Sequence, residues 1–323
     1  MTAGTAFCGR RTDNRKGITV IAIDRNITEK FRAVSDELLE NEPMSAHTSF
    51  KIGGPADMFV SVKSAGEAAA LIRLARENDV PYMIMGNGSN MLVGDRGIRG
   101  LVIQIGKKLA GSEVDGSGVR AGAGILMSRL AMVAAKAGLS GFEPLSGIPG
   151  TLGGALFMNA GAYGGEIGDT VVSVTYLDDS GELHTISREE CGFGYRHSVF
   201  SGGGKYIVSA RLALSPGSEA EIRDKMAEYS RRRNEKQPLS QPSAGSTFKR
   251  PEGYFAGKLI QDAGLMGFGI GGAAVSEKHA GFVVNRGGAT AEDVLRLIEH
   301  IQKAVEDRFG VRLEPEVRFV GER

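Results

Sequence analysis

The first two thirds of the chain alternate between short, largely apolar runs and amphipathic stretches. Runs such as PYMIM at 81–85 and LVIQI at 101–105 are typical of buried strands. Ser64 followed by Glu67 has the spacing of a capping box, which predicts a helix that begins there. The whole pattern predicts helices at about 28–40, 64–78 and 126–137 and strands at 58–62, 81–85, 101–105, 171–177 and 205–214.

The last third of the chain has a different pattern. Its predicted elements are a long charged helix at 218–235, helices at 256–263 and at 291–309 capped by Thr290, and a strand at 312–320. Strands and helices interleave without a regular βαβ repeat, so we expect an α+β fold. We expect three parts: a polar extension at 1–27, a region at 28–217 with two lobes split near 105, and a domain at 218–323.

Composition and charge exclude several classes of function. The 323 residues carry a formal net charge of +1, which argues against binding to nucleic acid or to a membrane surface. No apolar stretch approaches the roughly 18 residues of a membrane span, and the N-terminus lacks the apolar core of a secretory signal. The two cysteines, Cys8 and Cys191, form no disulfide framework and suggest no metal site. We therefore expect a monomer in a reducing cytoplasm.

Glycine is the unusual component, with 47 residues concentrated in a few loops. One such loop, GNGSN, directly follows the predicted strand at 81–85. Successive backbone N–H groups in a glycine-rich loop can form an anion-binding nest, and serine and asparagine add side-chain donors. This predicts a phosphate-binding loop, with a tight turn as the alternative, made of Gly86, Asn87, Gly88, Ser89 and Asn90.

A second glycine-rich stretch, GIPGTLGGALFMNAGAYGGEIGD, covers residues 147–169. A helix that starts at Thr151 would direct its first N–H groups toward a pyrophosphate, while a glycine-rich packing seam is the alternative. Two such loops together favour a ligand of dinucleotide size. The candidate cofactor contacts here are Gly150, Thr151, Gly153, Gly154, Asn159 and Gly161.

Five motifs in a fixed order give a specific resemblance. They are GNGSNMLVGDRGIRG, GIPGTLGGALFMNAGAYGGE, YRHSVF, GSTFKRP and LEPEVRF. In this order the chain resembles the UDP-N-acetylenolpyruvoylglucosamine reductase family over about residues 45–320. Only SGGGKY separates Phe200 from the next predicted strand, so the chain is similar to the second type of the family, which lacks a tyrosine-bearing lid.

The resemblance implies a fold, cofactors and partners. It implies a two-part FAD-binding unit of the vanillyl-alcohol-oxidase (PCMH) type and a C-terminal α+β substrate-binding domain. FAD would be bound non-covalently, because no histidine or cysteine lies in an attachment motif. NADPH would be the hydride donor, and a UDP-sugar enolpyruvyl ether, an intermediate of peptidoglycan precursor synthesis, would be the substrate.

Three catalytic residues are carried over from the family motifs. Arg196 of YRHSVF would meet the substrate carboxylate, Ser246 of GSTFKRP would protonate C2, and Glu316 of LEPEVRF would accompany the carboxylate. Stabilising charge where it develops is usually the largest catalytic contribution. The alternatives are a surface ion pair for Arg196, a turn cap for Ser246 and a solvated strand edge for Glu316, with Glu314 as its rival.

The substrate diphosphate contacts depart from the family pattern. At position 266 the family usually carries lysine or arginine, whereas this chain has Met266, which cannot neutralise a phosphate. Lys249 and Lys258 are the predicted substrate-binding residues, and Arg250 is a further candidate to compensate.

Two other functions remain as alternatives. Another flavoenzyme of the same cofactor fold, acting on an alcohol or sugar, explains the glycine-rich loops but leaves GSTFKRP and LEPEVRF unexplained. A non-catalytic nucleotide-sugar binder is disfavoured because Arg196, Ser246 and Glu316 are all present. A serine hydrolase is excluded because no GxSxG elbow surrounds Ser246.

Overall fold

The computed structural model describes residues 24–323, which divide into two compact units. Most of the expected N-terminal extension, including Cys8, lies outside the described residues. Unit 1 runs to Glu40 and includes Asp57–Gly86 and Gly100–Tyr229, and unit 2 comprises Asn41–Ala56, Asn87–Arg99 and Ser230–Arg323. This division differs from the expected one, because two short segments of the N-terminal half group with the C-terminal part.

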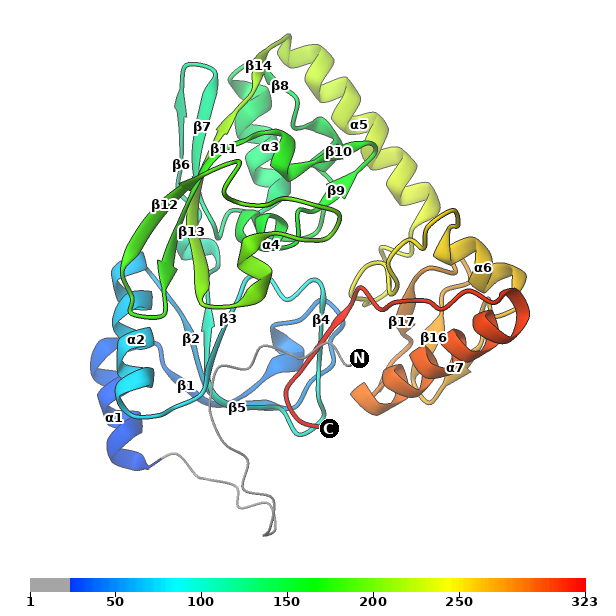
Figure 1. The fold of residues 1–323 in the computed structure, drawn as a ribbon, viewed down its shortest axis with the longest axis horizontal. Coiled ribbons are helices and arrows are strands. Elements are labelled where there is room, and N and C mark those ends of the chain that lie inside the picture. Colours follow the sequence, from blue (N-terminus) through cyan, green and yellow to red (C-terminus); the bar gives the residue numbers. More distant parts are fainter. Residues whose placement is uncertain (1–23) are drawn as a thin grey trace. The chain divides into compact units, whose positions relative to one another are not determined.

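The first lobe pairs two helices with a four-stranded sheet. Helix α1 (Arg25–Val34) begins slightly earlier than expected because Asp24 accepts the backbone N–H of Asn26 at 3.0 Å. The N-cap expected at Ser64 is confirmed, since its side chain accepts the N–H of Glu67 at the start of α2 (Ala65–Glu77). Figure 1 shows α1 and α2 side by side. The sheet has the order β1 (Leu39–Pro43), β2 (Pro55–Ser61), β5 (Ile98–Gln104) and β3 (Tyr82–Met85).

The second lobe is built on a five-stranded antiparallel sheet. Its strands, in order, are β12 (Leu183–Ser187), β11 (Val171–Asp178), β13 (Lys205–Ala213), β7 (Gly118–Gly122) and β6 (Ser112–Asp115). The polar hairpin of β6 and β7 carries little apolar periodicity, so the sequence did not predict it. The remaining elements here are α3 (Met127–Lys136), α4 (Leu152–Phe157), β8 (Leu139–Ser140), β9 (Gly161–Ala162), β10 (Gly165–Glu166), β14 (Ser215–Pro216), and the 3₁₀ helices η2 (Lys107–Leu109), η3 (Glu143–Leu145), η4 (Ile167–Asp169) and η5 (Val199–Gly202).

The two lobes of unit 1 share one hydrophobic core. Val60 and Leu101 of the first sheet belong to the same buried cluster as Val119, Leu130 and Val174 of the second lobe. Each fully buried aliphatic side chain of this kind contributes about 1.5–3 kcal/mol of transfer free energy. The lobes are therefore parts of one cooperative unit.

A polar cluster also joins the lobes. The hydroxyls of Tyr82, on β3, and Tyr206, on β13, both donate to Asp179 Oδ1, at 2.9 and 2.7 Å. The two hydroxyl oxygens lie 3.1 Å apart. Burial raises the pKa of Tyr82 to about 12, and burial together with the bond to Tyr82 raises the pKa of Tyr206 as well.

This cluster predicts a loss of stability at alkaline pH. Below pH 10 both phenols are protonated in the folded and unfolded chains, and the contribution is complete. As the pH rises toward 12 the unfolded chain loses its protons first, so the free energy of unfolding falls. Chemical denaturation at several pH values should show an extra loss on the order of 1 kcal/mol in the parent protein relative to the Tyr82→Phe, Tyr206→Phe double variant. Equal slopes for the parent, the double variant and an exposed control, Tyr254→Phe, would contradict this assignment.

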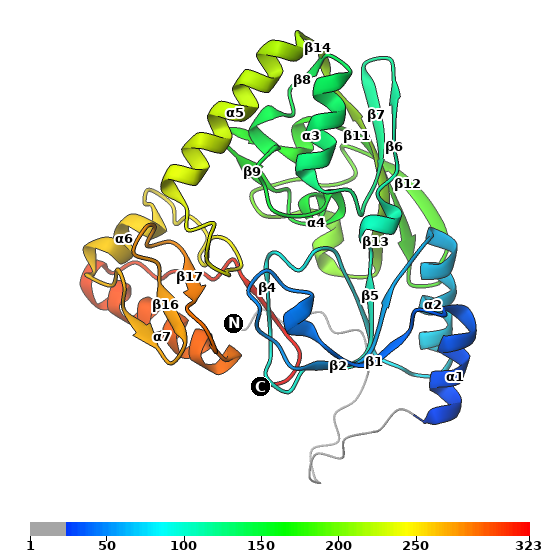
Figure 2. The same ribbon diagram turned by 180° about the vertical axis from the view of Figure 1, so that it is seen from behind.

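Unit 2 is an α+β unit around helix α7 (Ala291–Phe309). The expected cap is confirmed, because Thr290 and Asp293 form a reciprocal capping box. Asp95, distant in sequence, also accepts the N–H groups of Ala291 and Glu292. Figure 2 shows α7 beside α6 and β16, and their apolar side chains form the second core. The other elements are η1 (Met44–Ala46), α6 (Ala256–Asp262), β15 (Gly269–Ile270), β16 (Ala273–Val275), β17 (Val283–Asn285), β18 (Arg318–Val320), β4 (Met91–Val93), and the long helix α5 (Glu219–Lys236), most of whose C-terminal half belongs here.

The last strand is shorter than expected. Only Arg318–Val320 forms β18, which pairs in parallel with β4, whereas residues 312–317 carry an isolated antiparallel bridge between Pro315 and Phe248. The Leu313 carbonyl accepts Gln302 Nε2 at 2.8 Å, and Pro315 has no N–H to donate to a sheet ladder. Among residues 24–323 no helix is long and apolar enough to cross a membrane.

Candidate active site

In unit 1 the two glycine-rich stretches meet at Gly86 and Thr151. A Cβ built on Gly86 would lie 2.5 Å from Thr151 Oγ1, so a side chain at position 86 would collide with Thr151. Thr151 is buried and forms the N-cap of α4, where its hydroxyl accepts the N–H of Gly154. Residues more than sixty positions apart in sequence are thus brought to one place by close backbone approach.

The start of α4 does not offer its N–H groups as expected. Leu152 donates to the Ile125 carbonyl and Gly153 to the Ala123 carbonyl, both at 2.8 Å, and Gly154 donates to Thr151. A Cβ on Gly153 would lie 2.9 Å from the Ala123 side chain. Here the glycine-rich packing alternative describes the structure better than a pyrophosphate-binding helix end.

Two further cofactor candidates are also occupied by internal packing. Asn159 is only 2% exposed, and its amide is engaged with neighbouring protein groups. Gly161 pairs with Glu166 across the β9–β10 hairpin, and a Cβ there would lie 2.9 Å from Glu166 Cγ. The polar atoms of the Asn159 side chain are therefore already bonded within the protein, and its contact with the cofactor stays a prediction.

Arg196 lies in a tight turn of unit 1. Gly194 and His197 exchange two backbone hydrogen bonds of 3.1 Å, and Arg196 between them has a φ of 54°. Its guanidinium carbon lies 5.0 Å from the centroid of the exposed Tyr195 ring. The turn thus presents Arg196 in a left-handed backbone conformation that non-glycine residues rarely adopt.

In unit 2 the loop of Asn87–Asn90 is attached to the strand that follows Glu316. Asn90 Nδ2 donates to the Glu316 carbonyl at 3.1 Å, and the Asn90 carbonyl accepts the N–H of Arg318 at 3.0 Å. The Gly88 carbonyl accepts the N–H of Ser49, and Gly88 has a φ of 61° that suits glycine. The predicted cofactor loop and the predicted catalytic glutamate are therefore neighbours.

Ser246 is exposed, whereas the next residue, Thr247, is buried and firmly held. Thr247 is 4% exposed, and its hydroxyl accepts the N–H of Val283 at 2.9 Å. The Thr247 N–H donates to the Gly281 carbonyl, and its carbonyl accepts the N–H of Glu316 at 2.8 Å. Thr247 thereby joins the Ser246 segment to the Glu316 segment while the Ser246 side chain remains at the surface.

The two rival glutamates have different surroundings. Glu314 is exposed and forms an ion pair with Lys249, whose Nζ lies 2.5 Å from Glu314 Oε1. Glu316 is half-buried between Thr247 and Asn90. This environment favours Glu316 over Glu314 as the functional carboxylate.

The basic residues predicted to bind the substrate each have a partner in unit 2. Lys258 pairs with Asp262 at 2.5 Å on the surface of α6, as Lys249 does with Glu314. Arg250 lies 4.0 Å from the centroid of the exposed Phe255 ring. Exposed pairs of this kind are weak, so these side chains can exchange their partners for a ligand phosphate at little cost.

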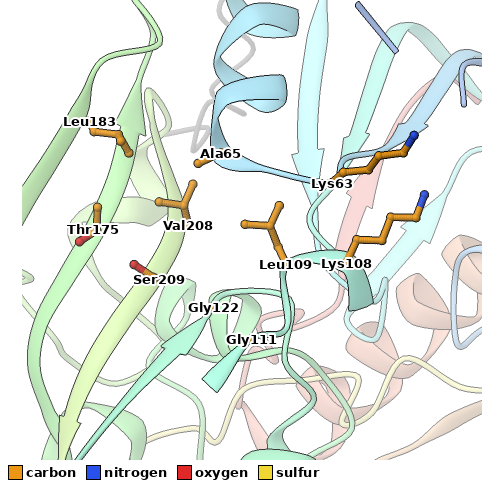
Figure 3. Close-up of a pocket in the computed structure, with 10 residues that line it drawn as sticks. All are labelled: Lys63, Ala65, Lys108, Leu109, Gly111, Gly122, Thr175, Leu183, Val208 and Ser209. Atoms are coloured by element: carbon orange, nitrogen blue, oxygen red, sulfur yellow. The ribbon is translucent and has the colours of Figure 1, made fainter. Parts of the chain in front are cut away.

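A separate pocket of about 420 Å³ opens on the five-stranded sheet of unit 1 (Figure 3). Figure 3 shows Lys63 and Lys108 beside Leu109, with Thr175 and Ser209 on the neighbouring strands. The pocket contains none of the predicted site residues, and both lysines form ion pairs with Glu37. It therefore has no part in the candidate active site.

Comparison with known proteins agrees with this geometry. Residues 237–320 match the model of the UDP-N-acetylenolpyruvoylglucosamine reductase C-terminal domain, and residues 56–187 match an FAD binding domain. The reductase of that name from Agathobacter rectalis is 51% identical over 310 residues, which cover 92% of this chain and 98% of the relative.

The chain belongs to the UDP-N-acetylenolpyruvoylglucosamine reductase family. The Caldanaerobacter subterraneus reductase is 50% identical, with 92% of this chain and 99% of the relative covered. The crystal structure of the UDP-N-acetylenolpyruvylglucosamine reductase from Thermus caldophilus matches with a TM-score of 0.75 and 38% identity, over 88% of this chain and 98% of that chain.

Family membership confirms the expectations for fold class, cofactor and enzyme class. The chain is an FAD-dependent oxidoreductase of α+β fold, with an FAD-binding domain followed by the family's C-terminal domain. Its residues fit a flavin, because Gly86 leaves no room for a side chain beside Thr151 and Gly88 adopts a left-handed turn in the adjoining loop.

Sequence reasoning for this family member missed the residues that hold the site together. Thr247 and Ser198 act through buried or backbone hydrogen bonds to segments distant in sequence, and Asn90, predicted as a cofactor contact, also donates to the Glu316 carbonyl. Thr247 directly follows Ser246, and Ser198 lies two positions after Arg196. This closeness to predicted catalytic residues was the signal in the sequence that could have identified them. The sequence could not show which partners they bind.

Proposed function

We propose that the chain reduces UDP-N-acetylglucosamine enolpyruvate to UDP-N-acetylmuramate, with NADPH as the electron donor, in peptidoglycan precursor synthesis. The observation that carries the proposal is the arrangement in unit 2. There Thr247 and Asn90 hold the Ser246 segment, the Glu316 segment and a predicted FAD loop together. A reductase needs a proton donor and a carboxylate near its cofactor, and this unit brings candidates for both to the cofactor loop.

The proposed roles follow the charge that develops during reduction. FAD that is held by the proposed contacts and has been reduced by NADPH would supply a hydride to C3 of the enolpyruvyl group. The guanidinium of Arg196 binds the substrate carboxylate and stabilises the negative charge that accumulates on it, which is the electrostatic form of catalysis. The Ser246 hydroxyl gives its proton to C2, and Glu316 donates a hydrogen bond or proton beside the carboxylate. The sum is one hydride and one proton added across a C=C bond.

The proposed cofactor contacts are backbone approaches rather than charged side chains. Gly86 and Thr151 form the close approach in unit 1, and the loop of unit 2 adds donors that suit a pyrophosphate. Asn159 is left out of this set because its amide is already bound. The proposed set is Gly86, Asn87, Gly88, Ser89, Asn90, Gly150 and Thr151, with Gly153, Gly154 and Gly161 supporting its shape.

We also propose that the protein acts as a monomer in the cytoplasm. The formal net charge of +1 gives the chain no overall attraction to a nucleic acid or an anionic membrane, and Cys191 is a free thiol buried in unit 1. Burial raises the pKa of the Cys191 thiol to about 11, which keeps it in the unreactive protonated form.

The proposal is tested by the product. The purified, FAD-loaded protein is incubated with the enolpyruvyl UDP-sugar and NADPH, and in parallel with NADH, and the products are analysed by mass spectrometry. We expect a product that is heavier than the substrate by two hydrogen atoms, formed faster with NADPH. Unchanged substrate with either nucleotide would contradict the proposal.

Replacing Met266 by lysine should improve substrate binding. Met266 is 39% exposed, and the candidate cations Lys249 and Lys258 are each paired with a carboxylate. A new ammonium group facing the diphosphate is worth on the order of 1 kcal/mol, so the substrate KM should fall about fivefold. Steady-state kinetics at two ionic strengths measures this, with Met266→Gln as the uncharged control. An unchanged KM would mean that existing basic residues already neutralise the diphosphate.

A further inference from the structure

The turn that carries Arg196 contains a strained backbone conformation. Arg196 has a φ of 54°, and a non-glycine residue in this region is strained unless its surroundings impose the conformation. Two backbone hydrogen bonds between Gly194 and His197 close the turn. Groups outside the turn must therefore fix its orientation.

Two side chains attach the turn to the segment that ends helix α4. Asn159 Nδ2 donates to the Gly194 carbonyl at 3.1 Å, at the first residue of the turn. Ser198 Oγ, just past the turn, donates to the Phe157 carbonyl at 2.7 Å. Ser198 is fully buried and Asn159 nearly so, which shields both bonds from competing water.

The Asn159 amide can adopt only one orientation. Its second Nδ2 hydrogen goes to Glu166 Oε2 at 2.7 Å, and its Oδ1 accepts the N–H of Gly168 at 3.0 Å. In a flipped amide, the NH2 group of Asn159 would face the N–H of Gly168, so two donors would meet. The amide oxygen would face the oxygen atoms of Gly194 and Glu166, so acceptors would meet there. An aspartate here would place a carboxylate against the Gly194 carbonyl and the Glu166 carboxylate. The site therefore requires a group with two donors and an acceptor in this arrangement.

We infer that Asn159 is a positioning residue for Arg196, which it holds through the Gly194 carbonyl, and not a cofactor ligand. The inference rests on the proposed role of Arg196 at the substrate carboxylate. Asn159 itself has a φ of 45°. Its buried side-chain hydrogen bonds join this strained residue to the turn that carries Arg196. Misplacing a charged group by about 1 Å can lower a rate a hundredfold.

The test compares two variants. Asn159→Asp replaces the donating amide group by an accepting carboxylate oxygen, and Asn159→Gly removes the side chain while its backbone accommodates a positive φ. The FAD affinity is measured by fluorescence titration, and the two half-reactions by stopped-flow absorption. We expect an unchanged FAD affinity, unchanged reduction by NADPH, and reoxidation by the enolpyruvyl substrate slowed about 10- to 100-fold in both variants. The matched control is Thr170→Val, which removes a buried bond to the Ile167 carbonyl without touching the turn.

A double-variant cycle with Arg196→Gln separates positioning from general destabilisation. If Asn159 acts through Arg196, adding Asn159→Asp to Arg196→Gln causes no further loss of the reoxidation rate. A weaker FAD affinity with normal reoxidation would overturn the inference in favour of direct cofactor contact, and so would a slowing matched by Thr170→Val. If Arg196→Gln alone leaves reoxidation unchanged, the proposed function fails first. If Arg196→Gln slows reoxidation but Asn159→Asp and Asn159→Gly do not, this inference fails and the proposed function stands.

Discussion

Replacing Ser246 by alanine should leave reduction of the bound flavin by NADPH nearly unchanged and slow its reoxidation by substrate about a thousandfold. The serine hydroxyl is the proposed donor of the proton to C2, a step that occurs only in the second half-reaction. Gly245 before it has a φ of 75°, and Thr247 after it is bound on both sides, so alanine should not move the backbone.

The measurement is anaerobic stopped-flow absorption of the flavin in each half-reaction. Ser243→Ala is the matched control, because Ser243 contributes its carbonyl to Ser49 Oγ, at 2.7 Å, through the backbone of the same loop. It should leave both rates unchanged. An equal loss in both half-reactions of Ser246→Ala would show a structural role for the hydroxyl and exclude the acid role.

Replacing Glu316 by glutamine should likewise slow only reoxidation, by about a hundredfold or more. Glutamine keeps the size of the side chain and the backbone bonds to Thr247 and Asn90, but it removes the ionisable group. Folding should therefore be preserved while the transferable proton beside the substrate carboxylate is lost.

Glu314→Gln is the control that the chain itself offers for this prediction. Glu314 is exposed and paired only at the surface with Lys249, so its variant should keep both half-reaction rates within about twofold. The comparison is made on the same stopped-flow traces. The opposite outcome, a slow Glu314→Gln and a normal Glu316→Gln, would show that Glu314 is the functional glutamate.

The sequence predicted best those elements whose ends are determined locally. The caps at Ser64 and Thr290 lie three residues from the N–H groups they accept, and both helices begin where expected. The strand expected at 312–320 was largely wrong because Gln302 of α7 takes the Leu313 carbonyl and Pro315, which lacks an N–H, forms only an isolated bridge with Phe248. Local propensity cannot represent such tertiary contacts.

The site was predictable as a set of motifs but not as a network. The bond from Asn90 to Glu316 spans 226 positions, and no periodicity encodes a contact at that separation. The hydrogen bonds of Asn159 could not be predicted for a related reason. A glycine-rich loop suggests an exposed ligand contact, whereas burial and the orientation of the amide are tertiary properties. The sequence identified the residue types that reduction needs, and the structure shows the hydrogen bonds that join their segments.

The most direct test of the account is anaerobic mixing of the FAD-loaded protein, first with NADPH and then with the enolpyruvyl UDP-sugar, while the visible flavin absorption is followed. The account predicts bleaching by NADPH and a rapid return of colour when the sugar is added. Bleaching without a return of colour would contradict the assigned substrate and point to another flavoenzyme of this fold. A colourless protein that FAD cannot reconstitute would contradict the account as a whole.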